Sequence, residues 1–414
     1  MKKASIVSVG NELLNGQTVN TNMTYLSSEL LSNSIPVVSS YTISDDVDAI
    51  IRVFDLAVAD ADIILVTGGL GPTDDDLTRQ AFAGYLGTEL QLQADILGRL
   101  ENFFTKRNLQ MPEKNKIQAH IPVGAKALTN NIGTAPGIMA KVKGRLLFAL
   151  PGVPPEMRRM FAESVFPELR RFAGTQAIVV RKLRCFGAGE STISEMLGPT
   201  FQRGRNPLIN CTAEYGIITL HIIATATAED KDKALQMAEK DEESLRNKLG
   251  ELVYGTGEQT LAEVVGEELA RQKKTIAVAE SCTGGTVAKL LTDIPGASGY
   301  FKYGWVTYSN TAKIGELGVS MDLIEEYGTV SEQVAEAMAR GAIAKARTDF
   351  AIGITGIAGP TGGTEQKPIG LVYISIDSNT GCDTKRCLFS GDRQYIRLRA
   401  AQTALNMLRL KLNI

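Results

Sequence analysis

The sequence predicts a protein with two α/β segments separated by a small α+β unit. Its 414 residues exceed one ordinary domain, and a size of roughly 100 to 200 residues per domain favours two or three. Strand-like apolar runs alternate with amphipathic helical patterns near both ends of the chain, which is typical of a parallel sheet with crossover helices. Several of these runs end in glycine-rich loops, and ligands of open α/β sheets bind at the carboxyl ends of strands.

The first segment opens with a strand-like run, a glycine-containing break and a helical pattern through Leu26, Leu30 and Leu31. A second amphipathic helix is expected at residues 47–59. The expected strands are residues 4–9, 35–41, 62–67 and 145–150.

The pattern changes after residue 172 to a β-rich α+β unit. Strands are expected at residues 177–184 and 217–227, and helices at 190–197 and 230–249. The second strand alternates apolar and polar residues, so one face of its sheet should stay hydrated. We interpret this unit as a spacer or dimerisation domain, and we expect a homodimer because most soluble oligomers are symmetric homo-oligomers.

The third segment begins near Thr260 with a helix and continues as a second α/β sandwich. A glycine break at residues 280–285 follows its first strand and leads directly into another helix. The remaining elements are expected as strands at 275–279, 303–308, 350–355 and 371–377, and a closing helix at 392–410.

Composition excludes several classes of function. Forty-four basic and forty-six acidic residues leave a net charge of −2, so there is no overall electrostatic case for a nucleic-acid or membrane partner, and a small substrate is expected. Five cysteines form no C-x-x-C pair, and two histidines are too few for an obvious zinc cluster. Without a secretory leader pattern or a long apolar run, we expect reduced thiols and a cytoplasmic location.

Ser281 lies where a strand turns into a helix, so its hydroxyl should be exposed beside unpaired backbone N–H groups. Such a helix start favours an anion, which could be a substrate phosphate or a developing oxyanion. A serine needs a base, and both histidines lie outside this segment, so a lysine is the candidate. Tyr308 and Lys313 lie at and just past the end of the next predicted strand, and a buried lysine with a lowered pKa can act as general base.

A third glycine loop, residues 355–363, follows another buried strand and leads to Lys367. Three loops at strand ends could therefore converge on one pocket. Taken singly, each piece also has a structural interpretation: the serine as a helix N-cap, the glycines as a tight turn, the lysine as a solvated charge.

The strings AESCTGG, GWVTYSNTAK, GITGIAGPTGGTEQKPIG and FSGDR, in this order and spacing, resemble the carboxyl-terminal domain of the competence/damage-inducible protein family CinA. The resemblance covers residues 260–414 and implies nicotinamide mononucleotide deamidase activity that needs no cofactor. It implies Ser281 as nucleophile, Lys313 as base and Tyr308 as a helper in proton transfer. The residues expected to bind substrate are Thr283, Gly284, Gly285, Thr355, Gly356, Gly359, Lys367 and Arg393.

Near the amino terminus, the string TGGLGPTDDDLT at residues 67–78 places three aspartates after a glycine loop. Clustered carboxylates can hold a divalent cation and, through it, a pyrophosphate. The alternative is a helix start with acidic residues that favour the positive end of its dipole. Two further loops at strand ends, GNELL at 10–14 and LPGVPPEM at 150–157, favour a site.

These three strings resemble the molybdopterin-binding fold and, in detail, the amino-terminal domain of the CinA family over residues 1–170. The resemblance implies a three-layer α/β domain that hydrolyses ADP-ribose to AMP and ribose 5-phosphate, with Mg²⁺ or Co²⁺ at Asp75 and Asp76. Many relatives have an aspartate where this chain has Asn11, so a purely nucleotide-binding pocket is the alternative. The nucleotide site is expected to contain Glu12, Asn22, Asp45, Gly68, Gly69, Gly71, Thr73, Thr78 and Glu156.

The middle segment resembles the KH-like linker domain of full-length family members. A nucleic-acid-binding KH module needs a GXXG loop and a basic surface, and Gly187-Ala188-Gly189-Glu190 is not that loop. We therefore expect no nucleic-acid partner.

Together these observations predict a three-domain enzyme of pyridine-nucleotide recycling, with domains at residues 1–172, 173–256 and 257–414. Its expected substrates, nicotinamide mononucleotide and ADP-ribose, are both products of NAD breakdown. The alternative is a non-catalytic nucleotide- or molybdopterin-binding protein, because a fold alone does not determine a function.

Overall fold

The computed structural model describes residues 2–172 and 176–414, and it divides into two compact units. One unit comprises Met1–Val179 with Ala224–Leu235, and the other comprises Val180–Ile223 with Gln236–Ile414. The predicted boundary between residues 172 and 173 falls at residues 173–175, outside the described residues. The three predicted domain limits therefore stay a prediction.

The first unit is built on a mixed six-stranded sheet in the order β2-β1-β3-β8-β7-β6. Its first four strands in this order are parallel, as predicted. β7 is antiparallel to both β8 and β6. Lys143 and Gly144, with positive φ values of 49° and 80°, form the two-residue hairpin turn between β7 and β8. The strands are β1 (Ala4–Val9), β2 (Val37–Ile43), β3 (Ile63–Thr67), β6 (Lys126–Leu128), β7 (Gly137–Val142) and β8 (Arg145–Leu150).

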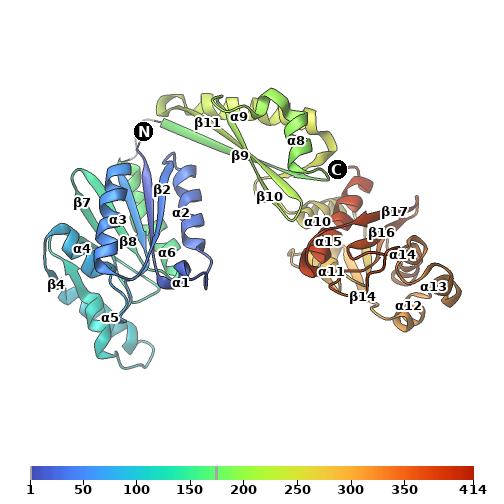
Figure 1. The fold of residues 1–414 in the computed structure, drawn as a ribbon, viewed down its shortest axis with the longest axis horizontal. Helices are drawn as coiled ribbons and strands as arrows, with labels where there is room; N and C mark the ends of the chain where they lie inside the picture. Colours follow the sequence, from blue (N-terminus) through green and yellow to red (C-terminus); the bar gives the residue numbers. More distant parts are fainter. Residues whose placement is uncertain (1, 173–175) are drawn as a thin grey trace. The chain divides into compact units, whose positions relative to one another are not determined.

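Helices cover both faces of this sheet and complete the predicted three layers. One face packs against α3, α4 and α5, and the other packs against α2, α6 and α7 (Figure 1). A short two-stranded antiparallel sheet of β4 (Leu90–Leu92) and β5 (His120–Pro122) and the 3-10 helix Glu113–Ala119 accompany α5. The helices are α1 (Asn11–Leu14), α2 (Thr21–Ser32), α3 (Val47–Asp60), α4 (Thr78–Leu86), α5 (Ala94–Thr105), α6 (Pro154–Met160), the π-helix Phe161–Val165 and α7 (Phe166–Phe172).

The middle region is a four-stranded antiparallel-rich sheet in the order β10-β11-β9-β12, accompanied by two helices. Along β11, Leu220, Ile222 and Ala224 are buried while His221 and Ile223 are half-buried, which agrees with the predicted alternation. Its elements are β9 (Gln176–Phe186), α8 (Glu190–Leu197), the 3-10 helices Gly198–Phe201, Ala228–Asp230 and Gly250–Leu252, β10 (Leu208–Glu214), β11 (Ile217–Thr227), α9 (Lys231–Leu249) and β12 (Val253–Thr256).

The carboxyl-terminal sheet has the order β14-β13-β15-β16-β17, with β13 parallel to both of its neighbours. β16 and β17 are antiparallel, so the sandwich is mixed. Helices α10, α11 and α15 cover one face and α12 to α14 the other (Figure 1). The elements are α10 (Leu261–Gln272), β13 (Ile276–Glu280), α11 (Thr286–Thr292), the 3-10 helix Ala297–Gly299, β14 (Phe301–Val306), α12 (Asn310–Leu317), α13 (Met321–Tyr327), α14 (Glu332–Ala346), β15 (Phe350–Gly356), β16 (Leu371–Ser378), β17 (Gly381–Leu388) and α15 (Arg393–Lys411).

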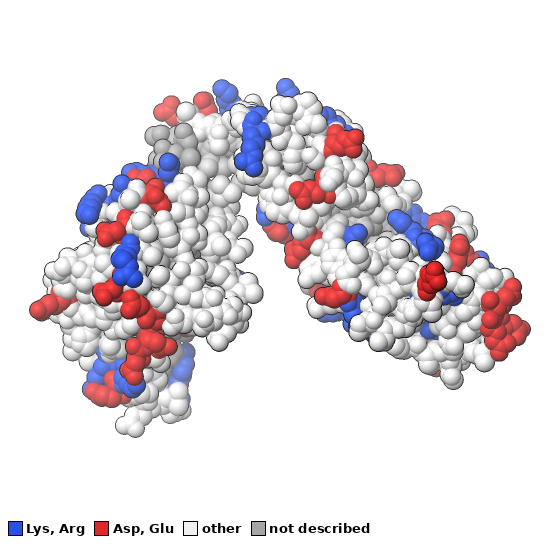
Figure 2. All heavy atoms as spheres, viewed as in Figure 1, with Lys and Arg blue, Asp and Glu red and all other residues white. Residues whose placement is uncertain are grey.

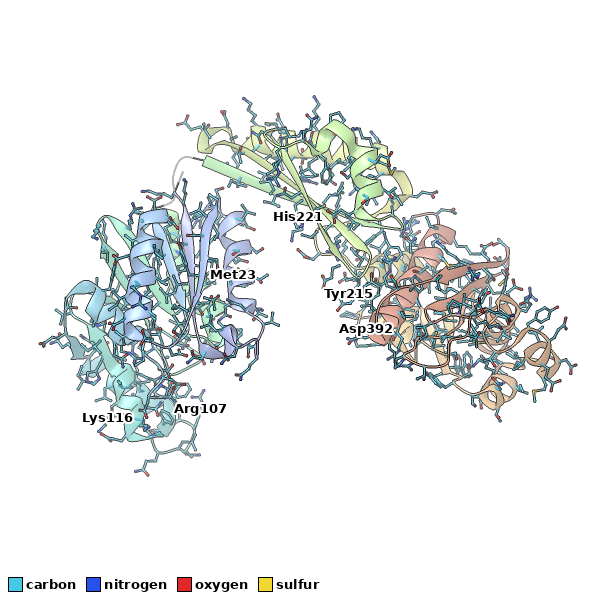
Figure 3. The ribbon with its side chains drawn as sticks, in the orientation of Figure 1. Met23, Arg107, Lys116, Tyr215, His221 and Asp392 are labelled. Atoms are coloured by element: carbon cyan, nitrogen blue, oxygen red, sulfur yellow. The ribbon has the colours of Figure 1, made fainter. Side chains whose placement is uncertain are left out.

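The turn between β10 and β11 contacts α15 within the second unit. Arg399 donates to the carbonyl of Tyr215 at 3.1 Å, and its guanidinium lies so close to Gly216 that a Cβ there would overlap it. The ring centroids of Tyr215 and Tyr395 are 5.8 Å apart. Figure 3 shows Tyr215 beside Asp392, the N-cap of α15. The hairpin turn is therefore fitted to this helix.

Charge on the visible face agrees with the balanced composition. Figure 2 shows acidic and basic side chains interspersed over that face. Within residues 2–172 and 176–414, no helix is both long and apolar enough to cross a lipid bilayer.

Candidate active site

Three loops of the carboxyl-terminal domain lie at one edge of its sheet, as predicted. β14, β13 and β15 are adjacent and parallel, so their carboxyl ends are at the same edge. Ser281 follows β13, the segment 307–313 follows β14, and the glycine loop 357–370 follows β15.

Ser281 and Lys313 form a buried hydrogen-bonded pair. The distance from Lys313 Nζ to Ser281 Oγ is 3.0 Å, and Lys313 also donates to the carbonyl of Thr307 at 2.8 Å. Ser309 caps α12 by accepting from the N–H of Ala312, which places Lys313 in the first turns of that helix. The Lys313 side chain is 0% exposed, and burial lowers its pKa from 10.5 to about 8. A lysine in this setting can be neutral and accept a proton.

The predicted exposure of the Ser281 hydroxyl is wrong. Ser281 is only 7% exposed, because its hydroxyl faces the buried amine of Lys313 rather than the surface.

The prediction of unpaired N–H groups after Ser281 is also wrong for most of the turn. The carboxylate of Glu280, which is 0% exposed, accepts from the N–H groups of Gly285 at 3.0 Å, Val287 at 3.1 Å and Ala288 at 2.8 Å. The N–H of Gly284 donates to the carbonyl of Ser281. The start of α11 thus already holds an anion, the side chain of the residue before Ser281.

Thr283 keeps an unused polar group. Its side chain is buried, and its hydroxyl has no hydrogen-bond partner in the described chain. Its carbonyl accepts from Arg397 at 2.7 Å and 3.2 Å. Backbone N–H groups of the turn therefore donate to the Glu280 carboxylate, and a backbone carbonyl of the turn accepts from the Arg397 guanidinium.

Tyr308 and Arg393 lie together at a more open part of the site. Tyr308 is 57% exposed, and its hydroxyl accepts from Arg393 at 2.6 Å. Arg393 also donates to the carbonyl of Gly359 at 2.8 Å. This guanidinium links the loops after β14 and β15 with the start of α15, and it is exposed to solvent.

The remaining residues predicted to bind substrate have contacts within the protein. The hydroxyl of Thr355 donates to the carbonyl of Thr329 at 2.9 Å, and Lys367 Nζ donates to the carbonyl of Tyr327 at 2.7 Å. Gly356 is the last residue of β15, where a Cβ would lie 2.8 Å from the carbonyl of Leu371. Their role in substrate binding stays a prediction.

Sequence reasoning missed three residues of this site: Glu280, Thr307 and Arg397. Glu280 had a detectable signal, because it is a single acidic residue at the end of the fully buried strand IAVAE. The backbone carbonyl of Thr307 and the guanidinium of Arg397 act from positions that only the folded chain brings close.

The amino-terminal unit contains a cavity of about 430 Å³ at the carboxyl ends of β1, β3 and β8. Burial raises the pKa of Asp45, and the neighbouring carboxylates of Glu12, Asp75 and Asp76 raise it further, against the lowering effect of the Asn11 N–H. These four carboxylates therefore share one region of negative potential. The predicted residues that line the cavity are Glu12, Asn22, Asp45, Gly68, Gly69, Gly71, Asp75, Asp76 and Glu156.

Thr73 and Thr78, also predicted for this site, hold the glycine loop instead of lining the cavity. Thr78 Oγ1 donates to the carbonyl of Gly68 at 2.8 Å, and the N–H of Thr73 donates to Asp76 at 2.9 Å. Gly68 has φ +106°, and a Cβ there would lie 2.1 Å from the carbonyl of Val9.

Asn22 is a buried amide that lines this cavity. Its side chain is 8% exposed, and its Nδ2 donates to Thr67 Oγ1 at 3.0 Å and to the carbonyl of Gly152 at 2.7 Å. Its Oδ1 has no partner among the residues described. Asn22 thus adds a neutral oxygen without a partner to the residues that line the cavity together with the carboxylates.

Asp75 and Asp76 are not part of a preformed metal cluster. Within residues 2–172 and 176–414, no group of three or more His, Cys, Asp or Glu side chains is placed to hold a metal ion. The available donors are carboxylate and amide oxygens, which suit hard cations such as Mg²⁺.

Comparison with known families identifies all three regions. Residues 258–412 match the CinA C-terminal domain, residues 5–171 match a probable molybdopterin binding domain, and residues 180–255 match the damage-inducible protein CinA KH domain. The class is thus a molybdopterin-binding-type α/β domain joined through a KH-like domain to a CinA C-terminal domain.

Relatives of the same length extend this match over the whole chain. The chain is 42% identical to a putative competence-damage inducible protein of Caldicellulosiruptor bescii over 409 residues, covering 99% of both chains. It is 41% identical to a protein of the same name from Clostridioides difficile, again covering 99% of both, and 41% identical to a CinA-like protein of Kosmotoga olearia, covering 98% of both. The chain belongs to the CinA family.

Solved structures resemble parts of the chain. The competence/damage inducible protein CihA from Agrobacterium tumefaciens is 40% identical with a TM-score of 0.36, covering 37% of this chain and 94% of that one. The molybdopterin biosynthesis enzyme MoaB from Thermus thermophilus is 19% identical with a TM-score of 0.29, covering 42% of this chain and 94% of that one.

Proposed function

We propose that the carboxyl-terminal domain hydrolyses the carboxamide of nicotinamide mononucleotide to nicotinate mononucleotide and ammonia. The observation that carries this proposal is the 3.0 Å contact between Ser281 and the buried, low-pKa amine of Lys313. A neutral amine next to a hydroxyl is the arrangement that activates a serine without histidine.

In the proposed reaction, Lys313 Nζ takes the hydroxyl proton as Ser281 Oγ attacks the carboxamide carbon. The C–N bond then breaks, and the Lys313 ammonium returns the proton to the leaving nitrogen, which departs as ammonia. Lys313 then takes a proton from a water molecule whose oxygen attacks the ester carbon. The bond from that carbon to Ser281 Oγ breaks, and the Lys313 ammonium returns the proton to Oγ, which releases nicotinate mononucleotide and free Ser281. When the Lys313 amine is neutral and one of its N–H groups donates to the Thr307 carbonyl, its lone pair is free to accept the Ser281 hydroxyl proton. All these steps use groups of the chain and water.

Two neighbours would assist this reaction. Thr283, with its buried hydroxyl that has no partner in the described chain, is a candidate oxyanion donor in a turn whose Gly284 and Gly285 N–H groups are already occupied. Arg393 is an exposed cation beside Tyr308, so it suits the substrate phosphate while the Tyr308 hydroxyl assists proton transfer.

The test is ammonia release from nicotinamide mononucleotide by the purified protein, measured beside Ser281→Ala and Asp76→Ala. We expect the wild type and Asp76→Ala to release ammonia and Ser281→Ala to be inactive while still folded. Substantial turnover by Ser281→Ala would exclude it as nucleophile. A folded wild-type protein that binds nucleotides or molybdopterin without turnover would favour the non-catalytic binding function.

A second activity is proposed for the amino-terminal cavity, namely metal-dependent hydrolysis of ADP-ribose. The supporting observation is that four interacting carboxylates line the same cavity as Asn22, whose Oδ1 has no partner in the described chain. They are Glu12, Asp45, Asp75 and Asp76. Mg²⁺ is usually bound by one or two carboxylates together with substrate phosphates, so a preformed three-residue cluster is not required. A metal held there would neutralise the pyrophosphate, and Asp75 and Asp76 would hold it.

AMP formation from ADP-ribose, with and without Mg²⁺ or Co²⁺, tests this second activity. We expect metal-dependent AMP in the wild type and much less in Asp76→Ala. Metal-independent formation, or equal formation by both proteins, would overturn the assignment.

A further inference from the structure

Glu280 occupies an unusual place for a charged residue. It ends the central strand β13, immediately before Ser281, and its side chain is completely buried. Burying a carboxylate is costly unless hydrogen bonds compensate it. Here three backbone N–H groups, those of Gly285, Val287 and Ala288, do so.

The geometry of these bonds ties the carboxylate to the shape of the turn that follows Ser281. Oε2 accepts from Gly285 and Val287, and Oε1 accepts from Ala288. Gly284 and Gly285 both have positive φ, 59° and 91°, so this turn departs from helical geometry before α11 begins. The Glu280 carboxylate links the end of β13 to the start of α11, so it restricts the backbone conformation of the turn between them.

Two more contacts tie Glu280 and the turn to the proposed base. The Thr307 N–H donates to the backbone carbonyl of Glu280 at 2.9 Å, and the carbonyl of Thr307 accepts from Lys313. On the other side of the turn, Arg397 donates to the carbonyl of Thr283. The Glu280 carboxylate therefore accepts from backbone N–H groups that follow Ser281, and Arg397 donates to the backbone carbonyl of Thr283 in the same turn.

We infer that Glu280 and Arg397 are positioning residues that hold the Ser281 turn in its reactive geometry, Glu280 through three backbone N–H groups and Arg397 through the Thr283 carbonyl. This inference rests on the proposed function of Ser281. Neither side chain transfers a proton or touches the substrate in this role. Their effect is on the rate of nucleophilic attack, because small displacements of a reacting atom reduce rates strongly.

Glu280→Gln is the sharpest change. The amide has nearly the same shape, but it presents an NH₂ group where one acceptor oxygen stood, so at least one backbone N–H faces another donor. Glu268→Gln is the matched control, because Glu268 is another buried glutamate of the same domain and accepts from the side chains of Arg271 and Gln272 on α10.

In the full-length protein, Glu280→Gln should lower kcat for ammonia release by about 10- to 100-fold with little change in KM. The pH at which the rate levels off should stay where it is in the wild type, because Lys313 is unchanged. Glu268→Gln should keep the wild-type kcat even if it melts at a lower temperature. A Glu280→Gln protein that melts like the wild type and keeps kcat within twofold would overturn the inference, as would an equal loss of kcat in Glu268→Gln.

Arg397→Lys provides a second test if Glu280→Gln does not fold, since Arg397 approaches the turn from α15 at a half-buried position. It should also lower kcat while leaving KM unchanged, and an unchanged kcat would overturn the positioning role of Arg397. Labelling of Ser281 by a small serine-directed fluorophosphonate adds a readout that needs no substrate. If the wild type is labelled but releases no ammonia, the proposed substrate is wrong, whereas the positioning role still requires slower labelling of Glu280→Gln than of Glu268→Gln.

Discussion

The buried amine of Lys313 should give both the activity and the stability of the protein a defined pH dependence. Burial lowers its pKa from 10.5 to about 8. A base must be neutral to accept a proton, so the rate of ammonia release should rise with pH and level off above about pH 8. At pH 7 about one tenth of the Lys313 amine is then neutral, roughly 300-fold more than for a lysine of ordinary pKa.

Stability should change in the same direction. Because the folded pKa is lower than the unfolded one, the unfolded chain binds more protons between about pH 8 and 10.5, and the free energy of unfolding rises with pH in that window. The expected gain is about 3 kcal/mol for a fully buried amine. Lys313→Met has no titrating group, so it should lose the activity and this part of the pH dependence together.

Initial rates of ammonia release between pH 6 and 10, and denaturant unfolding of the wild type and Lys313→Met at pH 7 and 10, would test these values. Between pH 7 and pH 10 the difference in unfolding free energy between the two proteins should move by about 2 to 3 kcal/mol in favour of the wild type, because the unfolded lysine is still mostly protonated at pH 10. A rate that levels off only near pH 10.5, or a Lys313→Met protein that keeps more than one tenth of the wild-type kcat, would refute the reasoning.

Three further predictions concern separate parts of the chain. Tyr308→Phe should lower kcat by about tenfold or more, with an unchanged melting temperature because the side chain is mostly exposed; wild-type kcat would remove it from the mechanism. Asp76→Ala should leave the kcat of deamidation within twofold of the wild type, since it lies in the other compact unit, and a large loss would show that the sites depend on each other. Gly216→Ala should cost about 1 to 3 kcal/mol of unfolding free energy in the second unit, because the new Cβ displaces Arg399. Gly204→Ala, at a similar positive φ in open space, should cost about 1 kcal/mol. Equal effects of the two variants in denaturant unfolding would count against the contact of Arg399 with the hairpin turn.

Much of the fold could be predicted because apolar runs and periodic helices are local features. The strands 145–150 and 217–227 and the helix 190–197 were predicted with the bounds that the structure has. The antiparallel strands β7, β10 and β17 were not predicted, because a strand on the outer part of a sheet has a weak apolar pattern and depends on its partner for definition. The strand predicted at 303–308 begins earlier, at Phe301, since pairing with Ile276 sets its start.

The pairing of Ser281 with Lys313 could be predicted from the order of loops at the edge of a parallel sheet, and the 3.0 Å contact confirms that they meet. The environment of the turn could not be predicted in the same way. A serine before two glycines suggests an open helix start, but the buried carboxylate of Glu280 fills that start. The difference arises because side-chain caps on backbone groups depend on rotamers and burial, which a sequence pattern does not specify.

Helix α15 sets a spacing requirement for the whole second unit. Three arginines of α15 donate hydrogen bonds to backbone carbonyls of other segments: Arg393 to the loop after β15, Arg397 to the Ser281 turn, and Arg399 to the hairpin of the middle region. Since each residue advances an α-helix by about 100°, inserting one residue between positions 393 and 397 would rotate the first arginine away from the other two. The number of residues in this stretch of helix thus determines whether all three arginines can reach their partners. We expect homologous chains to vary in its side chains far more readily than in its length.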